Sequence, residues 1–140
     1  MADMIHVVAI NEKQEKIFRA LTQQDGLAKW WTFSAKAEPK EGSIAEFGFY
    51  GGQVVFKMKI TQLKTPEKVE WECVEGPPEW VNTKLSFQLS TGENGTNLRF
   101  IHGNWQSTEN MFGGVNYQWA LYLLSLKKYV ETGTGEPNLE

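Results

Sequence analysis

Few residues of this chain have the types and spacing that metal or phosphate chemistry needs. The sequence holds two histidines, His6 and His102, and one cysteine, Cys73. A structural zinc site uses four Cys or His ligands and a disulfide uses two cysteines, so neither is expected. No cofactor is expected either, because Gly51-Gly52 and Gly113-Gly114 lack the Lys-Ser/Thr pair of a phosphate-binding loop.

His102 is the residue best suited to acid–base chemistry. It shares strand parity with the apolar Phe100, so its side chain is predicted to point inward. A catalytic imidazole needs a partner, and Glu70 and Glu72 have the opposite, solvent-side parity. We therefore expect a hydrogen-bonded structural histidine, no catalytic residue, and a binding protein rather than an enzyme. Cys73 is interpreted as a small buried apolar side chain.

Aromatic side chains are the other feature that could do chemistry. They make up 13% of the residues, with six tryptophans, and Trp30 and Trp31 are adjacent in the stretch GLAKWWTFSAKAEP, residues 26–39. Successive side chains are rotated by about 100° on a helix and 180° on a strand, so the two indoles cannot face the same way. One is expected to fill a junction between helix and sheet, and the other to lie near a cavity mouth or on the surface. The alternative is that both only pack.

Composition and charge exclude several classes of protein. A chain of 140 residues, 41% apolar and 22% charged, fits one globular domain, predicted over residues 1–135 with a tail over 136–140. No apolar run approaches the roughly 18 residues of a membrane span, so no membrane insertion is expected. The net charge of −3 argues against a nucleic-acid partner. Residues 1–6 lack the features of a signal peptide, which predicts a cytoplasmic protein.

The first segments predict a strand followed by two short helices. Residues 4–10 are apolar and β-branched and predict the strand, and Asn11 is expected to cap the next helix. A turn at Gly26 should lead to a second helix over 27–31 and then to a strand over 32–38. The first helix is indicated by the helical spacing of its apolar residues Ile17, Phe18 and Leu21.

Alternating apolar and polar residues predict antiparallel strands over 45–60, 69–73, 81–89 and 98–102, with the first of these stretches folded as a hairpin about Gly51-Gly52. Each strand has one apolar face, so the sheet needs a cover on one side. Within the third stretch, the residues expected to point toward that cover are Val81, Thr83, Leu85, Phe87 and Leu89.

Residues 115–131 are the only long segment able to cover the sheet. They are apolar almost all round, which predicts a helix enclosed by protein on several sides. Residues 107–114, which contain two glycines, are expected to form a flexible loop beside a cavity entrance. The predicted fold class is α+β, a helix-grip fold. A curved antiparallel sheet of six or seven strands wraps around a long C-terminal helix, with two short helices between the first and second strands. A ligand cavity is most expected between that helix and the sheet.

This layout resembles the START-like or birch-pollen-allergen-like (SRPBCC) superfamily, and within it the family named after the activator of heat-shock-protein-90 ATPase. The resemblance covers nearly the whole chain. It departs from the family pattern at Ile10-Asn11, where members usually have Ala-Pro, and at Gln118, where they usually have Gly. The matching stretches are IFRALTQQDGLAKWW (17–31, ending in Trp30-Trp31), Thr96-Asn97-Leu98 with His102-Gly103, Trp119, and SLKKYVETG (125–133).

The resemblance implies a fold more specifically than a function, because relatives include lipid carriers, hormone-binding proteins, polyketide cyclases and co-chaperone domains. We expect binding or sensing of a small hydrophobic molecule, lipid-like or aromatic, with directional hydrogen bonds from His102, Tyr50 or Tyr117. The alternatives are a co-chaperone-like module with a protein partner, and a cyclase- or hydrolase-type enzyme on the same fold. The oligomeric state is left open. The expected ligand-binding residues are Trp31, Phe47, Phe56, Met58, Trp71, Leu85, Phe87, Phe100, His102, Val115, Trp119 and Leu123.

Overall fold

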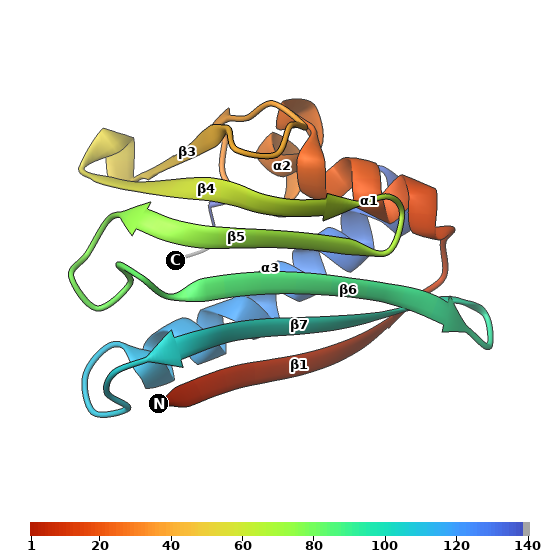
Figure 1. Cartoon of the computed structure of the whole chain (residues 1–140). Coiled ribbons are helices and arrows are strands. Elements are labelled where there is room, and N and C mark those ends of the chain that lie inside the picture. The colour runs from red at the N-terminus through yellow and green to blue at the C-terminus, as the bar shows by residue number, and fades with distance from the viewer. Residues whose placement is uncertain (139–140) are drawn as a thin grey trace.

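A single antiparallel sheet of seven strands with a long helix lying across one face forms the framework of the protein (Figure 1). The structure, a computed structural model, describes residues 1–138. The α+β helix-grip fold predicted from the sequence is confirmed. The elements in chain order are β1 (Ala2–Ile10), α1 (Gln14–Thr22), α2 (Gln24–Trp30), β2 (Ser34–Lys36), β3 (Ile44–Phe49), the 3-10 helix η1 (Tyr50–Gly52), β4 (Val54–Lys64), β5 (Lys68–Glu75), β6 (Lys84–Gly92), β7 (Gly95–Trp105) and α3 (Phe112–Thr132).

The strand order is β1-β7-β6-β5-β4-β3-β2. Strands β2 to β7 therefore form a meander in which each strand lies beside the next. The exception is β1, which pairs with the last strand, so that Ile5 lies opposite Ile101 and Val8 opposite Leu98. In Figure 1 the helix α3 runs diagonally behind the sheet from the β7 side toward α1, and α1 lies beside the turn that joins β4 to β5.

The face assignment of β6 is confirmed. Leu85 is fully buried and Lys84 is exposed, which fixes the register, because a slip of one residue would reverse every side chain. The predicted start of this strand was too early. Val81 lies in the loop that joins β5 to β6 and is only half-buried, because Asn82 has a left-handed φ of 73° that ends the extended backbone before the strand begins.

Two local predictions near the N-terminus were wrong. Asn11 does not cap α1: the helix begins three residues later, and the Asn11 backbone N–H donates to Oε2 of Glu131 at 2.7 Å. Gly26 lies inside α2 rather than in a turn. A Cβ at this position would stand 2.8 Å from Cα of Ala20, so the glycine allows α2 to lie against α1.

The long helix also differs from its prediction at two places. Gly113 and Gly114 lie in the first turn of α3, so the loop before the helix is shorter than residues 107–114. The outer face of α3 is open to solvent, with Tyr117 67% and Leu124 58% exposed. The sheet, α1, α2 and the C-terminal tail cover the other sides of the helix, so the predicted enclosure is confirmed except along this outer face.

The predicted C-terminal tail is described as far as Asn138 and lies against the domain. The Glu136 N–H donates to Oγ of Ser125 at 2.7 Å, and the Asn138 N–H donates to the Trp31 carbonyl at 2.8 Å. The rest of the predicted tail lies outside the described residues. Within residues 1–138, no helix has the length and apolar character needed to cross a membrane.

Candidate functional site

A cavity of about 170 Å³ lies between α3, the hairpin of β3 and β4, and the loop over residues 76–83, called here the β5–β6 loop. Seven of its twelve wall residues are aromatic, and none carries a charge at neutral pH. The wall consists of Trp31, Phe49, Tyr50, Val54, Phe56, Pro77, Trp80, Met111, Val115, Gln118, Trp119 and Tyr122.

One face of α3 forms one side of the cavity. Val115, Trp119 and Tyr122 follow one another at spacings of four and three residues, which places them on the same side of a helix. The hairpin forms the opposite side, where Phe56 of β4 points inward. Tyr50 is 51% exposed at the end of this hairpin, so the cavity opens to solvent there.

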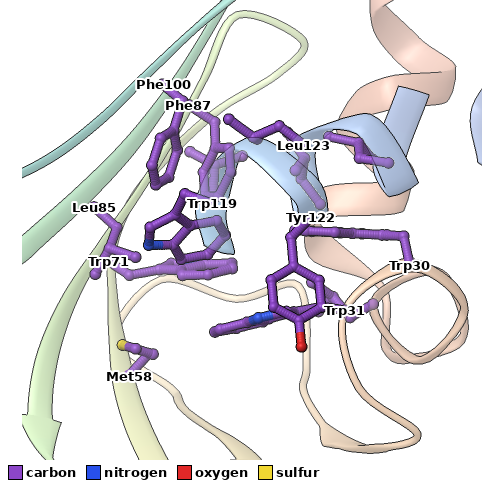
Figure 2. Close-up of a cluster of buried hydrophobic side chains, with 14 of the residues drawn as sticks. Trp30, Trp31, Met58, Trp71, Leu85, Phe87, Phe100, Trp119, Tyr122 and Leu123 are labelled. Carbon is purple, nitrogen blue, oxygen red and sulfur yellow. The ribbon is translucent and has the colours of Figure 1, made fainter. Parts of the chain in front are cut away.

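Four of the twelve residues predicted to bind a ligand lie in the wall, namely Trp31, Phe56, Val115 and Trp119. The other eight are buried outside the wall, most of them around the far side of Trp119 (Figure 2). Close ring contacts fill that region, with centroid distances of 5.0 Å for Phe87–Phe100 and 4.5 Å for Phe100–Trp119. The residues buried outside the wall are Phe47, Met58, Trp71, Leu85, Phe87, Phe100, His102 and Leu123.

Several wall residues come from segments that the strand pattern does not explain. Trp80 and Pro77 belong to the irregular β5–β6 loop, and Met111 precedes α3. A large aromatic residue in a Pro-rich loop is the signal that could have identified Trp80. Of the two tyrosines expected to contact a ligand, Tyr50 lies in the wall, whereas Tyr117 projects from the outer side of α3.

The adjacent tryptophans have different roles. The indole N–H of Trp30 donates to the Ala20 carbonyl at 2.8 Å, and this side chain fills the junction of α1 and α2. Trp31 forms part of the cavity wall and stacks on Trp71, with ring centroids 5.9 Å apart and planes 15° apart. Only 2% of Trp31 is exposed, so it is a wall residue rather than a residue of the mouth.

A chain of hydrogen bonds behind the wall fixes His102. The indole N–H of Trp119 donates to Nδ1 of His102 at 3.1 Å, so the ring proton must be on Nε2, which donates to Oγ1 of Thr83 at 2.9 Å. The Thr83 hydroxyl donates in turn to the Trp80 carbonyl at 2.6 Å. Burial lowers the pKa of His102 to about 3, so the imidazole is neutral. It positions two wall residues and has no free nitrogen for acid–base chemistry, as predicted for a structural histidine.

The single cysteine is not an activated nucleophile. Burial raises the pKa of the Cys73 thiol to about 11, which keeps it protonated and unreactive. The buried polar pair of His102 and Thr83 lies outside the cavity wall. Across residues 1–138 there is no group of three or more His, Cys, Asp or Glu side chains placed to hold a metal ion.

Comparisons with known proteins agree with this fold. The family model described as Activator of Hsp90 ATPase homolog 1-like protein matches residues 11–131. The chain is similar to a solved structure described as the Aha1 dimer from Colwellia psychrerythraea, with 40% identity, a TM-score of 0.88, and coverage of 96% of this chain and 100% of that chain. No curated protein matches.

More distant structures share the fold alone. Protein MLL2253 from Mesorhizobium loti has 19% identity and a TM-score of 0.82, with 93% of this chain and 97% of that chain covered. The AHSA1-like protein from Aeromonas hydrophila has 15% identity and a TM-score of 0.76, with 94% of each chain covered.

Proposed function

The chain belongs to the family of Activator of Hsp90 ATPase homolog 1-like proteins, and from this premise we propose that it binds a small apolar molecule in the cavity between α3 and the β3–β4 hairpin. The observation that carries the proposal is the uncharged, largely aromatic wall around about 170 Å³ of space. Burying apolar ligand surface against such a wall is favourable without any directed contact.

The cavity volume limits the size of the ligand. Pockets for drug-sized molecules measure roughly 300–1,000 Å³, whereas an apolar cavity of about 150 Å³ can hold benzene. A single ring or a short branched group fits this space, and a whole sterol or flavonoid does not. The proposed ligand contacts are Trp31, Phe56, Val115 and Trp119. The eight predicted residues that are buried outside the wall are proposed to hold these contacts in place by packing.

Titration with p-cresol, followed by NMR of the backbone amides, tests this proposal. Saturable shifts should concentrate on the cavity wall and be lost in Val115→Phe, which fills the space with a larger side chain. Val74→Phe, at an exposed position on the outer face of β5, is the matched control and should keep the shifts. Shifts that do not saturate, or that survive Val115→Phe, would refute binding in this cavity.

A second proposal, self-association, is favoured by the outer face of α3. No charged residue occurs between Phe112 and Leu126, and Tyr117, Ala120 and Leu124 are exposed there. A two-fold interface brings residues near the axis against their own copies, so a face without charges avoids repulsion. The relative with 40% identity is described as a dimer.

Light scattering with size-exclusion chromatography tests self-association. The wild-type protein should have about twice the monomer mass of 16.0 kDa, and Leu124→Glu should return it to the monomer mass. Val7→Glu, at a 66% exposed position on the edge strand β1, is the control. A monomeric wild type excludes the proposal, and dissociation by Val7→Glu alone would assign the interface to β1.

A further inference from the structure

Four aromatic rings of the cavity wall form a closed circuit of ring contacts. Phe49 contacts Tyr122 at a centroid distance of 6.3 Å, and Tyr122 contacts Trp119 at 6.3 Å. Trp119 contacts Trp31 at 5.3 Å, and Trp31 returns to Phe49 at 5.7 Å. Phe56 extends the circuit from Phe49, at 5.7 Å. A group held in the cavity is therefore bordered by π-systems from α3, from the β3–β4 hairpin and from the residue that follows α2.

These rings meet mostly edge to face. The interplanar angles are 62° for Trp31–Phe49, 63° for Phe49–Tyr122 and 68° for Trp119–Tyr122. Neighbouring rings therefore stand at steep angles to one another instead of forming one flat stack. The face of an aromatic ring carries negative charge density, which attracts a cation placed over it.

The charges around the cavity also favour a positive group. The wall contains no Lys, Arg or His, so no positively charged side chain in it repels a cation. Glu79 lies between the wall residues Pro77 and Trp80 in the sequence of the β5–β6 loop, although its own side chain is not part of the wall. Its Oε1 atom is buried, and no hydrogen-bond donor for it is found among residues 1–138. A buried carboxylate oxygen without a donor is stabilised by nearby positive charge.

The wall distinguishes between kinds of cation. A primary ammonium group has three N–H donors and loses their hydrogen bonds to water when it is buried among rings. A quaternary ammonium group has no N–H donor, and its methyl groups present apolar surface. It can therefore be buried in a wall made mainly of rings without leaving a donor unpaired.

We infer that the cavity binds the quaternary ammonium group of a small cation, with the rings of Trp31, Phe49, Trp119 and Tyr122 around it. The inference rests on the proposed binding of a small molecule at this site and specifies the chemical class of that molecule. The polar end of the cation would leave the cavity past Tyr50, where the wall is exposed.

A matched pair of probes tests the inference. Choline and 3,3-dimethyl-1-butanol have the same shape, but a carbon atom replaces the charged nitrogen in the second. Titrations followed by amide NMR should give choline a dissociation constant roughly 2- to 30-fold lower. Equal or tighter binding of the neutral probe would overturn the inference and leave apolar ligand binding intact. Binding of p-cresol without binding of choline would also overturn the inference and leave apolar ligand binding intact. If none of the three probes binds, both the quaternary ammonium inference and the proposed apolar ligand binding are overturned.

Variants of the wall separate ring attraction from simple burial. Phe49→Leu removes a ring but keeps apolar bulk, so it should weaken choline binding and leave the neutral probe nearly unchanged. Tyr50→Leu, at the exposed mouth, provides the same comparison if Phe49→Leu disturbs folding. Val54→Ala is the control, since this wall residue has no ring and its truncation should affect both probes alike. An unchanged choline preference in both ring variants would refute the role of the rings.

Discussion

The space between α3 and the sheet has a solid end and a hollow end, and the two are built from the same kinds of residue. At the solid end, Phe87 packs on Phe100 and Phe100 on Trp119, with centroid distances of 5.0 and 4.5 Å, and both phenylalanines are fully buried. At the hollow end, Phe49 and Phe56 lie at comparable distances from their neighbours but border the cavity. Aromatic content therefore does not decide where the interior is filled.

The structural elements that meet at each end decide whether the interior there is filled or hollow. The solid end is enclosed by paired strands and α3, so the side chains of both layers interdigitate. The hollow end is closed by a hairpin tip and the irregular β5–β6 loop, and the cavity remains between these segments and α3. Trp119 belongs to both ends, because one part of it packs on Phe100 and another faces the cavity.

Matched truncations of phenylalanine give the largest expected effect. Phe100→Ala at the solid end should lower the free energy of unfolding by about 3–5 kcal/mol. Phe56→Ala should cost at least about 1 kcal/mol less, because this side chain already borders open space and water can enter. Urea denaturation measures both. Equal costs would mean that the hollow end is packed as tightly as the solid one.

The second-largest loss of stability is expected when the hydrogen bonds behind the wall are removed. Thr83→Val keeps the side-chain shape but leaves Nε2–H of His102 without an acceptor, while the Trp80 carbonyl keeps only the backbone N–H of residue 83, and should cost about 1–3 kcal/mol. Thr61→Val is the control, since its hydroxyl is exposed and bonds Glu70, so its loss should cost less than about 0.5 kcal/mol. Similar losses of unfolding free energy in the two variants would contradict a structural role for these hydrogen bonds.

The pH dependence of the free energy of unfolding should arise at the solid end, from His102. The ordinary pKa of histidine is 6.5, and burial lowers that of His102 to about 3. Between these values the unfolded chain binds a proton that the folded protein does not, so stability falls as the pH falls. From pH 7 to pH 5 the loss should be about 2 kcal/mol, and His102→Gln should remove it. Identical pH profiles of the two proteins, measured by urea denaturation, would show that His102 is not the source.

The smallest effect is expected at the mouth of the hollow end. Tyr50→Phe removes a hydroxyl from a side chain that is 51% exposed, so the free energy of unfolding should change by less than about 0.5 kcal/mol. Thermal denaturation is sufficient to measure this. A large loss would mean that the mouth is part of the structural core.

The sequence predicts the layers of this fold well because strand parity and helix periodicity are local. Leu85 and Phe87 were assigned to the inner face correctly, and so was the position of α3 across the sheet. The wall of the cavity was predicted only in part. Parity tells which face a residue occupies, but not whether the opposite layer fills the space in front of it.

The errors share a cause, which is that each depends on a contact between different structural elements. Gly26 was assigned to a turn because its role, the close approach of α2 to α1, depends on Ala20. Asn11 was assigned as a cap, but its backbone bonds Glu131 at the other end of the chain. The wall residue Trp80 was missed because it lies in a loop and its neighbour Phe56 lies on β4, with ring centroids 4.2 Å apart.

The pairing of β1 with β7 has a consequence for how the chain is made. Strands β2 to β7 can pair hairpin by hairpin as they leave the ribosome, but β1, which is synthesised first, must wait for residues 95–105. During that time its apolar side chains, including Met4 and Ile10, have no sheet to pack against. Such long-range closure slows folding, because the cost of closing the loop comes before the contacts form. Of the seven strands, the one made first is thus among the last to be folded, and it is the strand with the longest exposure to aggregation and to molecular chaperones.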